Sequence, residues 1–192
     1  MDNSTKIAWG ITLMASAGAL LIWRSSKRNA PALNPYYDIE TMETNENLPR
    51  GYRNNNPLNI DYKTFNAWKG KILPNTDGRF EQFENMAYGY RAALVLLRNY
   101  IKKYGCNTIA KIIERWAPNN ENNTSGYIQR VCNTLGLAAN TPVTVNDKSL
   151  LCGLVYAMSL VENGYKDKVG NDLQSTYGLP NVDIINQAWE MI

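Results

Sequence analysis

The spacing of hydrophobic and polar positions predicts where helices lie in this chain. Over residues 86–104, apolar side chains recur every three or four positions, and Gly105 follows as a C-terminal stop. The same spacing predicts four further helices, which begin after Thr108, at Thr124, after Asp147 and at Asp183. The helix that Asp147 caps is expected to run to Glu162. The second half of the chain is therefore predicted to be helical.

A different pattern precedes these helices. Over residues 49–83, short aromatic and β-branched stretches are broken up by Gly, Asn and Pro, with residues 75–78 (NTDG) as one turn. This pattern predicts a small antiparallel β-hairpin region. The predicted fold class is mainly α, in an α+β arrangement.

The N-terminal segment predicts a transmembrane helix. Residues 7–23 carry no charge and would span about 25 Å, near the lower limit for crossing a bilayer. Trp9 and Trp23 lie near the two ends, where indole rings favour the membrane interface. A cleaved signal peptide is the alternative, with a small-residue site at residues 15–17. We favour an uncleaved anchor because the apolar run continues past that site and basic residues follow it.

The flanking charges predict an orientation for this anchor. One positive residue precedes the run, and three follow it: Arg24, Lys27 and Arg28. The positive-inside rule then places the C-terminal part on the cytoplasmic side. We predict three regions: an anchor with its basic flank over residues 1–28, a flexible linker over residues 29–48, and a folded domain over residues 49–192.

Composition narrows the chemistry. The chain has no histidine, which argues against Ser-His and Cys-His nucleophilic sites. Its three cysteines, Cys106, Cys132 and Cys152, lack metal-ligand spacing, so no metal and no cofactor is predicted. The formal net charge of +3 comes without a long basic stripe, so nucleic acid is not an expected partner. Acid–base chemistry would fall to carboxylates.

One carboxylate, Glu162, falls on the apolar face of a predicted helix. At about 100° per residue it aligns with Leu151, Val155 and Met158, at the helix C-terminus. Burial and the negative end of the helix dipole both disfavour the charged form, so we expect a raised pKa. A protonated carboxyl group could then donate to a glycosidic oxygen. A frayed helix end, with this side chain in solvent, is the competing interpretation.

No second carboxylate stands out. Glycoside hydrolysis commonly uses a pair of them, and the candidates near the predicted hairpin are Asp61, Asp77, Glu81 and Glu84. Asp77 lies in a turn beside Gly78, and each candidate also fits a turn-former or a surface charge.

The amides of the segment RNNNPLNI suit sugar hydroxyls and N-acetyl groups. Aromatic residues that could stack on sugar faces are Tyr52, Tyr62, Trp68 and Trp116. Turn chemistry and core packing are the competing interpretations of both groups.

Four segments together resemble a family of bacteriophage virion proteins. They are Pro49–Ile60, Thr76–Tyr100, Thr108–Val131 and Ala157–Gly164. Members of that family are structural proteins or lytic transglycosylase-like enzymes. A looser similarity is to lysozyme-like glucosaminidases, whose catalytic acid is a Glu at a helix end. The matching Glu-x-Gly here is residues 162–164, and it follows the predicted hairpin instead of preceding it. The resemblance thus implies a lysozyme-like, circularly permuted domain.

The resemblance also implies a function: a virion-associated lytic transglycosylase that cleaves the bond between N-acetylmuramic acid and N-acetylglucosamine in peptidoglycan. Glu162 would be the catalytic acid. The implied substrate-binding residues are Arg53, Asn54, Asn55, Asn56, Asn59, Tyr62 and Tyr127. Asp77 would be the second carboxylate of a muramidase variant. The alternative is a non-catalytic structural membrane protein of the virion.

The predicted anchor adds a location. The protein would lie in the internal membrane of a phage virion, and in the host inner membrane during assembly. Its expected partners are peptidoglycan, the lipid membrane through residues 7–23, and other virion proteins of the capsid or vertex. In that position the domain would meet the cell wall during genome entry.

Overall fold

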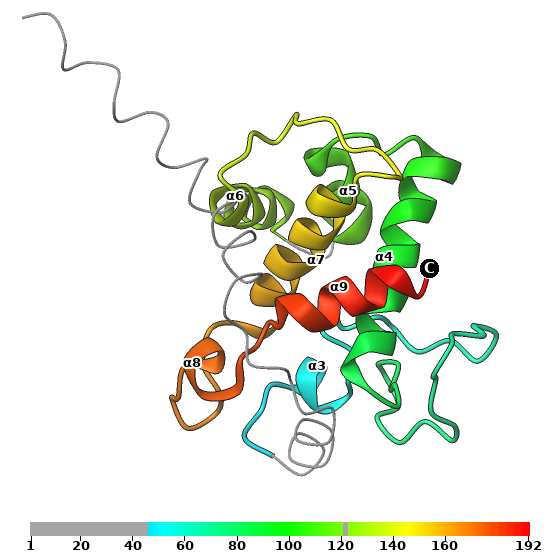
Figure 1. The fold of residues 1–192 in the computed structure, drawn as a ribbon, viewed down its shortest axis with the longest axis vertical. Coiled ribbons are helices and arrows are strands. Elements are labelled where there is room, and N and C mark those ends of the chain that lie inside the picture. The colour runs from blue at the N-terminus through cyan, green and yellow to red at the C-terminus, as the bar shows by residue number, and fades with distance from the viewer. Residues whose placement is uncertain (1–45, 121–122) are drawn as a thin grey trace, which may run out of the picture.

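The computed structural model describes residues 46–120 and 123–192, which form helices around one hydrophobic core (Figure 1). The helices within these ranges are α3 (Arg50–Arg53), α4 (Met86–Tyr104), α5 (Ile109–Trp116), α6 (Thr124–Leu135), α7 (Lys148–Asn163), α8 (Leu173–Tyr177) and α9 (Val182–Glu190). The core begins ahead of α3, because Leu48 is fully buried in it.

Local capping explains the borders of the longer helices. The side chains of Asn85, Thr108 and Asp147 accept hydrogen bonds from the first turns of α4, α5 and α7. Gly105 and Gly136 end α4 and α6 in the left-handed conformation. The helices predicted from periodicity are confirmed. The short helices α3 and α8 were not predicted, since a few residues are too short for a periodic pattern.

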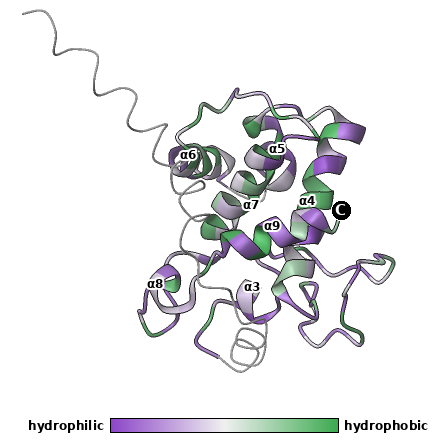
Figure 2. Cartoon of the chain, viewed as in Figure 1, coloured by the Kyte–Doolittle hydropathy of each residue, from purple (hydrophilic) through white to green (hydrophobic). Residues whose placement is uncertain are grey.

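Helix α7 occupies the centre of the molecule. Its fully buried residues include Leu151, Leu154, Val155 and Met158, and α3, α4, α6 and α9 all pack against it. Helix α9 crosses both α4 and α7 (Figure 1). Hydrophobic and hydrophilic positions alternate along α4 and α9, as expected for helices with one buried face (Figure 2). The C-terminal end of α7 is thereby held against α3 and the segment after α3, residues 54–85.

The predicted α+β, lysozyme-like fold class with a β-hairpin region is wrong. Within the described residues, the segment after α3 forms no strand, and antiparallel pairing is limited to isolated bridges such as Asp61–Phe80 and Lys71–Phe83. Side-chain hydrogen bonds hold this segment together in place of a ladder of backbone hydrogen bonds. Asn56, for example, donates to the backbone carbonyls of Ile60 and Glu81. Frequent Gly, Pro and Asn keep the stretches between turns too short for strands.

The predicted transmembrane helix of residues 7–23 lies outside the described residues, as does almost all of the predicted linker. Among the helices that the structure does describe, none combines the length and the apolarity that a membrane span needs.

Candidate functional site

The carboxylate of Glu162 sits in the last turn of α7 and accepts hydrogen bonds from three different parts of the chain. Its Oε1 accepts from Trp116 Nε1 at 3.1 Å and from the Tyr127 hydroxyl at 2.9 Å. Its Oε2 accepts from Asn59 Nδ2 at 3.2 Å. These donors belong to α5, α6 and the segment after α3. The Glu162 side chain is half-buried, so the competing interpretation, a frayed helix end with this side chain in solvent, does not apply.

Each residue of the motif Glu162-Asn163-Gly164 has a distinct structural role. Glu162 presents its carboxylate to the donors. Asn163 donates through Nδ2 to the carbonyl of Pro57 at 2.7 Å, which ties the end of α7 to the segment after α3. Gly164 ends the helix with a φ of 74°, a conformation that favours glycine. The motif therefore fixes both the carboxylate and the backbone that carries it.

Asn59 reaches Glu162 because of its unusual backbone conformation. Its φ is 51°, in the left-handed region that Asn tolerates better than most residues, and its N–H donates to the Asn56 carbonyl at 2.9 Å. The side-chain oxygens of Asn59 and Asn163 both face Gly51, where any β-carbon would collide with them. Gly51 thus permits a close approach of α3 to the side chains of Asn59 and Asn163.

The hydroxyl of Tyr127 is a permanent donor to Glu162. Burial raises the pKa of Tyr127 well above its usual range, and the negative charge of the neighbouring Glu162 raises it further. The indole N–H of Trp116 can only donate. Oε1 of Glu162 therefore accepts two hydrogen bonds at once, whereas Oε2 has one partner among the described residues. Oε2 is the oxygen with capacity left for a ligand.

Glu162 borders a cavity of about 410 Å³. The polar residues that line it are Asn59, Asp61, Lys63, Asn66, Arg79 and Glu162, and its aromatic residues are Phe80, Tyr100 and Trp116. Hydrogen-bonding groups beside aromatic rings are the composition that suits a saccharide, since sugars offer hydroxyls at their edges and apolar faces.

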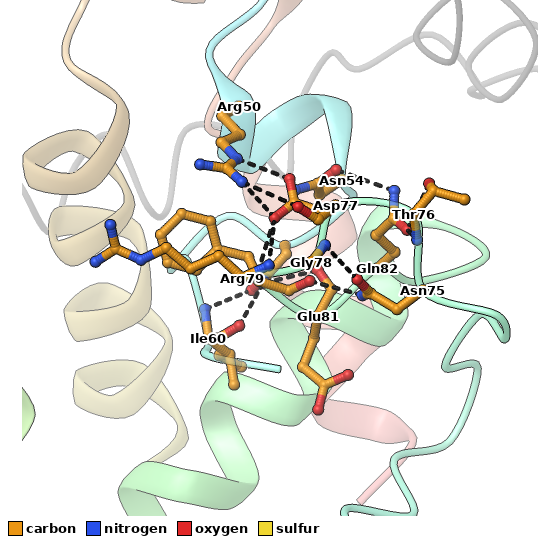
Figure 3. A network of polar contacts seen from close by, with 12 residues as sticks. Arg50, Asn54, Ile60, Asn75, Thr76, Asp77, Gly78, Arg79, Glu81 and Gln82 are labelled. Carbon is orange, nitrogen blue, oxygen red and sulfur yellow. Dashed lines mark hydrogen bonds and ion pairs between the residues drawn. The ribbon is translucent and has the colours of Figure 1, made fainter. Parts of the chain in front are cut away.

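Asp77 has a structural role in a polar network next to this cavity (Figure 3). Arg50 binds it through Nε at 2.7 Å and Nη2 at 2.6 Å, and Asn54 donates to it at 2.7 Å. Burial acts to raise the pKa of Asp77, but these bonds, together with those from the N–H groups of Phe80 and Arg79, outweigh it and hold the pKa well below its usual range. The carboxylate fastens α3 to residues 75–80, and it does not line the cavity.

Of the carboxylates near the predicted hairpin, Asp61 is the one that shares the cavity with Glu162. Glu81 is fully buried and paired with Lys71, whose Nζ lies 3.1 Å from its Oε2. Glu84 is exposed on the surface. The sequence favours Asp77 over Asp61 because the turn beside Gly78 is the one local signal among these carboxylates.

The structure brings two of the predicted substrate-binding residues, Asn59 and Tyr127, to Glu162. Asn54, Asn55 and Asn56 instead use their side chains to hold residues 77–83 in place. Asn56 is completely buried and donates to two carbonyls, while its Oδ1 accepts from the N–H of Ile60. The turn-chemistry interpretation thus describes the run of three asparagines.

The other two predicted residues lie apart from Glu162. Arg53 is exposed, and Tyr62 lies under the ammonium group of Lys71 at 4.4 Å from its ring centroid; neither lines the cavity. The sequence indicated Trp116 as a ring that could stack on a sugar, and its role as a hydrogen-bond donor to Glu162 was not predicted. Its indole N–H was the available signal, because a half-buried tryptophan usually needs a hydrogen-bond partner.

The fold and the site define a helical protein in which one carboxylate, held by three donors, borders a polar and aromatic cavity. No family model matches the chain. It is 41% identical over 117 residues to "Protein P5" of Pseudoalteromonas phage PM2, an alignment that covers 60% of this chain and 71% of that protein. The chain therefore belongs to the family of this bacteriophage protein.

Proposed function

We propose that this protein is a virion-associated peptidoglycan lytic transglycosylase, which cleaves the bond between N-acetylmuramic acid and N-acetylglucosamine and helps the phage genome through the cell wall. Glu162 is its proton donor and acceptor. One observation carries the proposal: the Glu162 carboxylate is fixed by Asn59, Trp116 and Tyr127 at the wall of a cavity with saccharide-binding composition. Membership in a phage protein family is consistent with a role in the virion.

In the proposed reaction the two carboxylate oxygens have different tasks. Oε1 is held by Trp116 and Tyr127, which fix the orientation of the group. Oε2 faces fewer donors, and in the protonated enzyme it gives its proton to the glycosidic oxygen as the bond to C1 of muramic acid breaks. The two donors on Oε1 stabilise the carboxylate that this transfer leaves behind.

The second half of the reaction returns the proton. The Glu162 carboxylate removes the proton from the 6-hydroxyl of the muramoyl residue, and the oxygen so activated attacks C1 and closes a 1,6-anhydro ring. No water is consumed and the enzyme is protonated again. This route needs one carboxylate, which agrees with the engagement of Asp77 by Arg50 and Asn54.

Two alternatives rest on specific observations. Asp61 lines the same cavity, so a hydrolase with Asp61 as the base for water is the close variant. Glu162 also connects three parts of the chain through its hydrogen bonds, as a carboxylate with a purely structural role would. The second candidate is therefore a non-catalytic structural component of the virion.

Replacing Glu162 by Gln tests the proposal. Glutamine keeps the size and the acceptor oxygen but cannot transfer the proton. We expect the full-length wild-type protein to clear purified sacculi and release 1,6-anhydro products, and Glu162→Gln to lower that rate by at least about 100-fold. Glu84→Gln, a change of the same kind on the surface, is the control.

The products separate the candidates by mass. Anhydro ends are lighter by one water than the reducing ends that hydrolysis leaves, so reducing ends would favour the Asp61 hydrolase. Unchanged clearing by Glu162→Gln would remove Glu162 from its role. Failure of the wild type to clear sacculi would leave the structural candidate. Unaltered circular dichroism of the variant shows that a loss of activity is not a loss of fold.

A further inference from the structure

A second cavity, of about 600 Å³, lies beside the Glu162 cavity, and Tyr100 lines both. It is formed where the end of α4 meets α5. On α5, Arg115 lines the second cavity and the next residue, Trp116, lines the first and donates to Glu162. The two cavities are therefore neighbours that share Tyr100 and are lined by the consecutive residues Arg115 and Trp116.

Arg115 lies against two tyrosine rings in this second cavity. Its guanidinium carbon lies 3.3 Å from the centroid of the Tyr104 ring and 5.1 Å from that of Tyr100, so one face of the group is covered by an aromatic ring. The two rings meet edge to face at 6.4 Å. Stacking fixes the guanidinium plane and leaves the N–H donors along its edge, the geometry that binds a carboxylate with two parallel hydrogen bonds.

Those donors have no protein partner in the described part of the chain. No ion pair or hydrogen bond joins the Arg115 side chain to any of residues 46–120 or 123–192. Lys111 adds a second positive charge to the cavity, against one negative charge from Glu114. Counted over the described residues that line it, the cavity thus carries a net positive charge, and the Arg115 donors lie beside an exposed tyrosine ring.

We propose that this second cavity is a subsite for the carboxylate of an acidic saccharide, the lactyl group of N-acetylmuramic acid, in a strand that also occupies the Glu162 cavity. The inference rests on the proposed function for the identity of the strand. Arg115 binds the carboxylate through two N–H groups, and Tyr104 supports the guanidinium. A neutral sugar in the same position has no carboxylate for the Arg115 N–H groups to bind. It is therefore bound less tightly than the acidic sugar.

The test compares two disaccharides that differ in the lactyl group. N-acetylglucosaminyl-N-acetylmuramic acid and di-N-acetylchitobiose are titrated into the full-length protein by calorimetry. We expect the acidic disaccharide to bind at least about tenfold more tightly to the wild type. Arg115→Gln should remove this preference and leave the affinity for chitobiose unchanged. Arg115→Lys should retain part of the preference, because it keeps the charge but loses the fork.

Lys102→Gln is the matched control, since it removes a positive charge from the exposed end of α4 without touching the cavity. Its preference for the acidic disaccharide should equal that of the wild type. The inference is overturned if Arg115→Gln keeps the preference, if it weakens both disaccharides equally, or if the wild type binds neither.

The binding test is separate from the test of catalysis. A preference that depends on Arg115, in a wild type that releases no product from sacculi, would support the acidic subsite while the proposed enzymatic function fails. Cleavage that depends on Glu162, without any preference between the disaccharides, would overturn the subsite and leave the function standing.

Discussion

At the scale of single residues, the carboxylates of this protein differ in the groups that surround them. Glu162 receives three neutral donors and borders open space. Asp77 receives a full guanidinium together with amide and backbone donors, and Glu81 is buried against Lys71. Asp77 and Glu81 are each paired with a cation, whereas the donors to Glu162 among the described residues are neutral and its carboxylate lines a cavity. The environment of each carboxylate therefore depends on the residues that pack beside it, and the residue type alone does not specify them.

The Asp77 network makes a prediction about pH. Because its pKa is lowered in the folded protein, Asp77 contributes stability fully above its unfolded pKa of about 3.9, and this contribution is lost as the pH falls toward the folded value. Asp77→Asn should lower the free energy of unfolding by about 2 kcal/mol at pH 7. The difference from wild type should shrink progressively between about pH 4 and pH 2.

Urea unfolding at a series of pH values measures this difference. Glu84→Gln, on the exposed surface, should show almost no effect at any of them. A gap between Asp77→Asn and wild type that stays constant from pH 7 to pH 2 would show that the stabilisation does not come from the charge.

At the scale of elements, the helices are specified locally but their contacts are not. The caps at Asn85, Thr108 and Asp147 and the glycine stop at Gly105 act within a few residues of the chain, so periodicity and capping located the longer helices. The hairpin prediction failed because strands need a partner elsewhere in the chain. In residues 49–83, backbone groups form hydrogen bonds with side chains such as those of Asn56 and Asp77. A continuous ladder between two strands does not form there.

The contact of α4 with Asn55 and Pro57, in the segment after α3, depends on Gly89. A β-carbon at this position would overlap the backbone carbonyl of Asn55 and crowd the ring of Pro57. Alanine inside a helix normally stabilises it relative to glycine by about 0.5–1 kcal/mol. Here we expect Gly89→Ala to destabilise the protein by about 1–3 kcal/mol, because a backbone atom cannot move aside as a side chain can.

Thermal unfolding of Gly89→Ala measures this cost, and Gly153→Ala in α7 is the control. A β-carbon there meets only the tip of Leu135, at 3.2 Å, which can rotate away. Equal melting temperatures for the two variants would contradict the close approach of α4 to the segment that carries Asn59.

At the scale of the whole molecule, one core connects the site to the C-terminus. Helix α9 packs on α4 and α7, and Ile185 on α9 is fully buried in the same cluster as Leu154 and Met158 of α7. Arg91 of α4 also donates to the carbonyl of Met191 at 3.1 Å. The site at the end of α7 should therefore lose its structure together with α9 and not separately.

Ile185→Ala should lower the free energy of unfolding by about 3 kcal/mol, because it removes buried methylene groups and leaves a cavity. Chemical unfolding followed by tryptophan fluorescence and by far-ultraviolet circular dichroism should give coincident transitions, both shifted equally. Ile192→Ala, at the exposed C-terminus, should have little effect. Separate transitions for the two probes would show that α9 and the site are independent units.

The sequence by itself determined the positions of the longer helices and placed Glu162 on an apolar face at a helix end, because periodicity and capping are properties of neighbouring residues. Only the tertiary structure decided which groups surround that carboxylate. Tyr127, Trp116 and Asn59 are 35, 46 and 103 positions away along the chain. Donors so distant meet only when α5, α6 and the segment after α3 pack around α7, and no local pattern encodes that encounter.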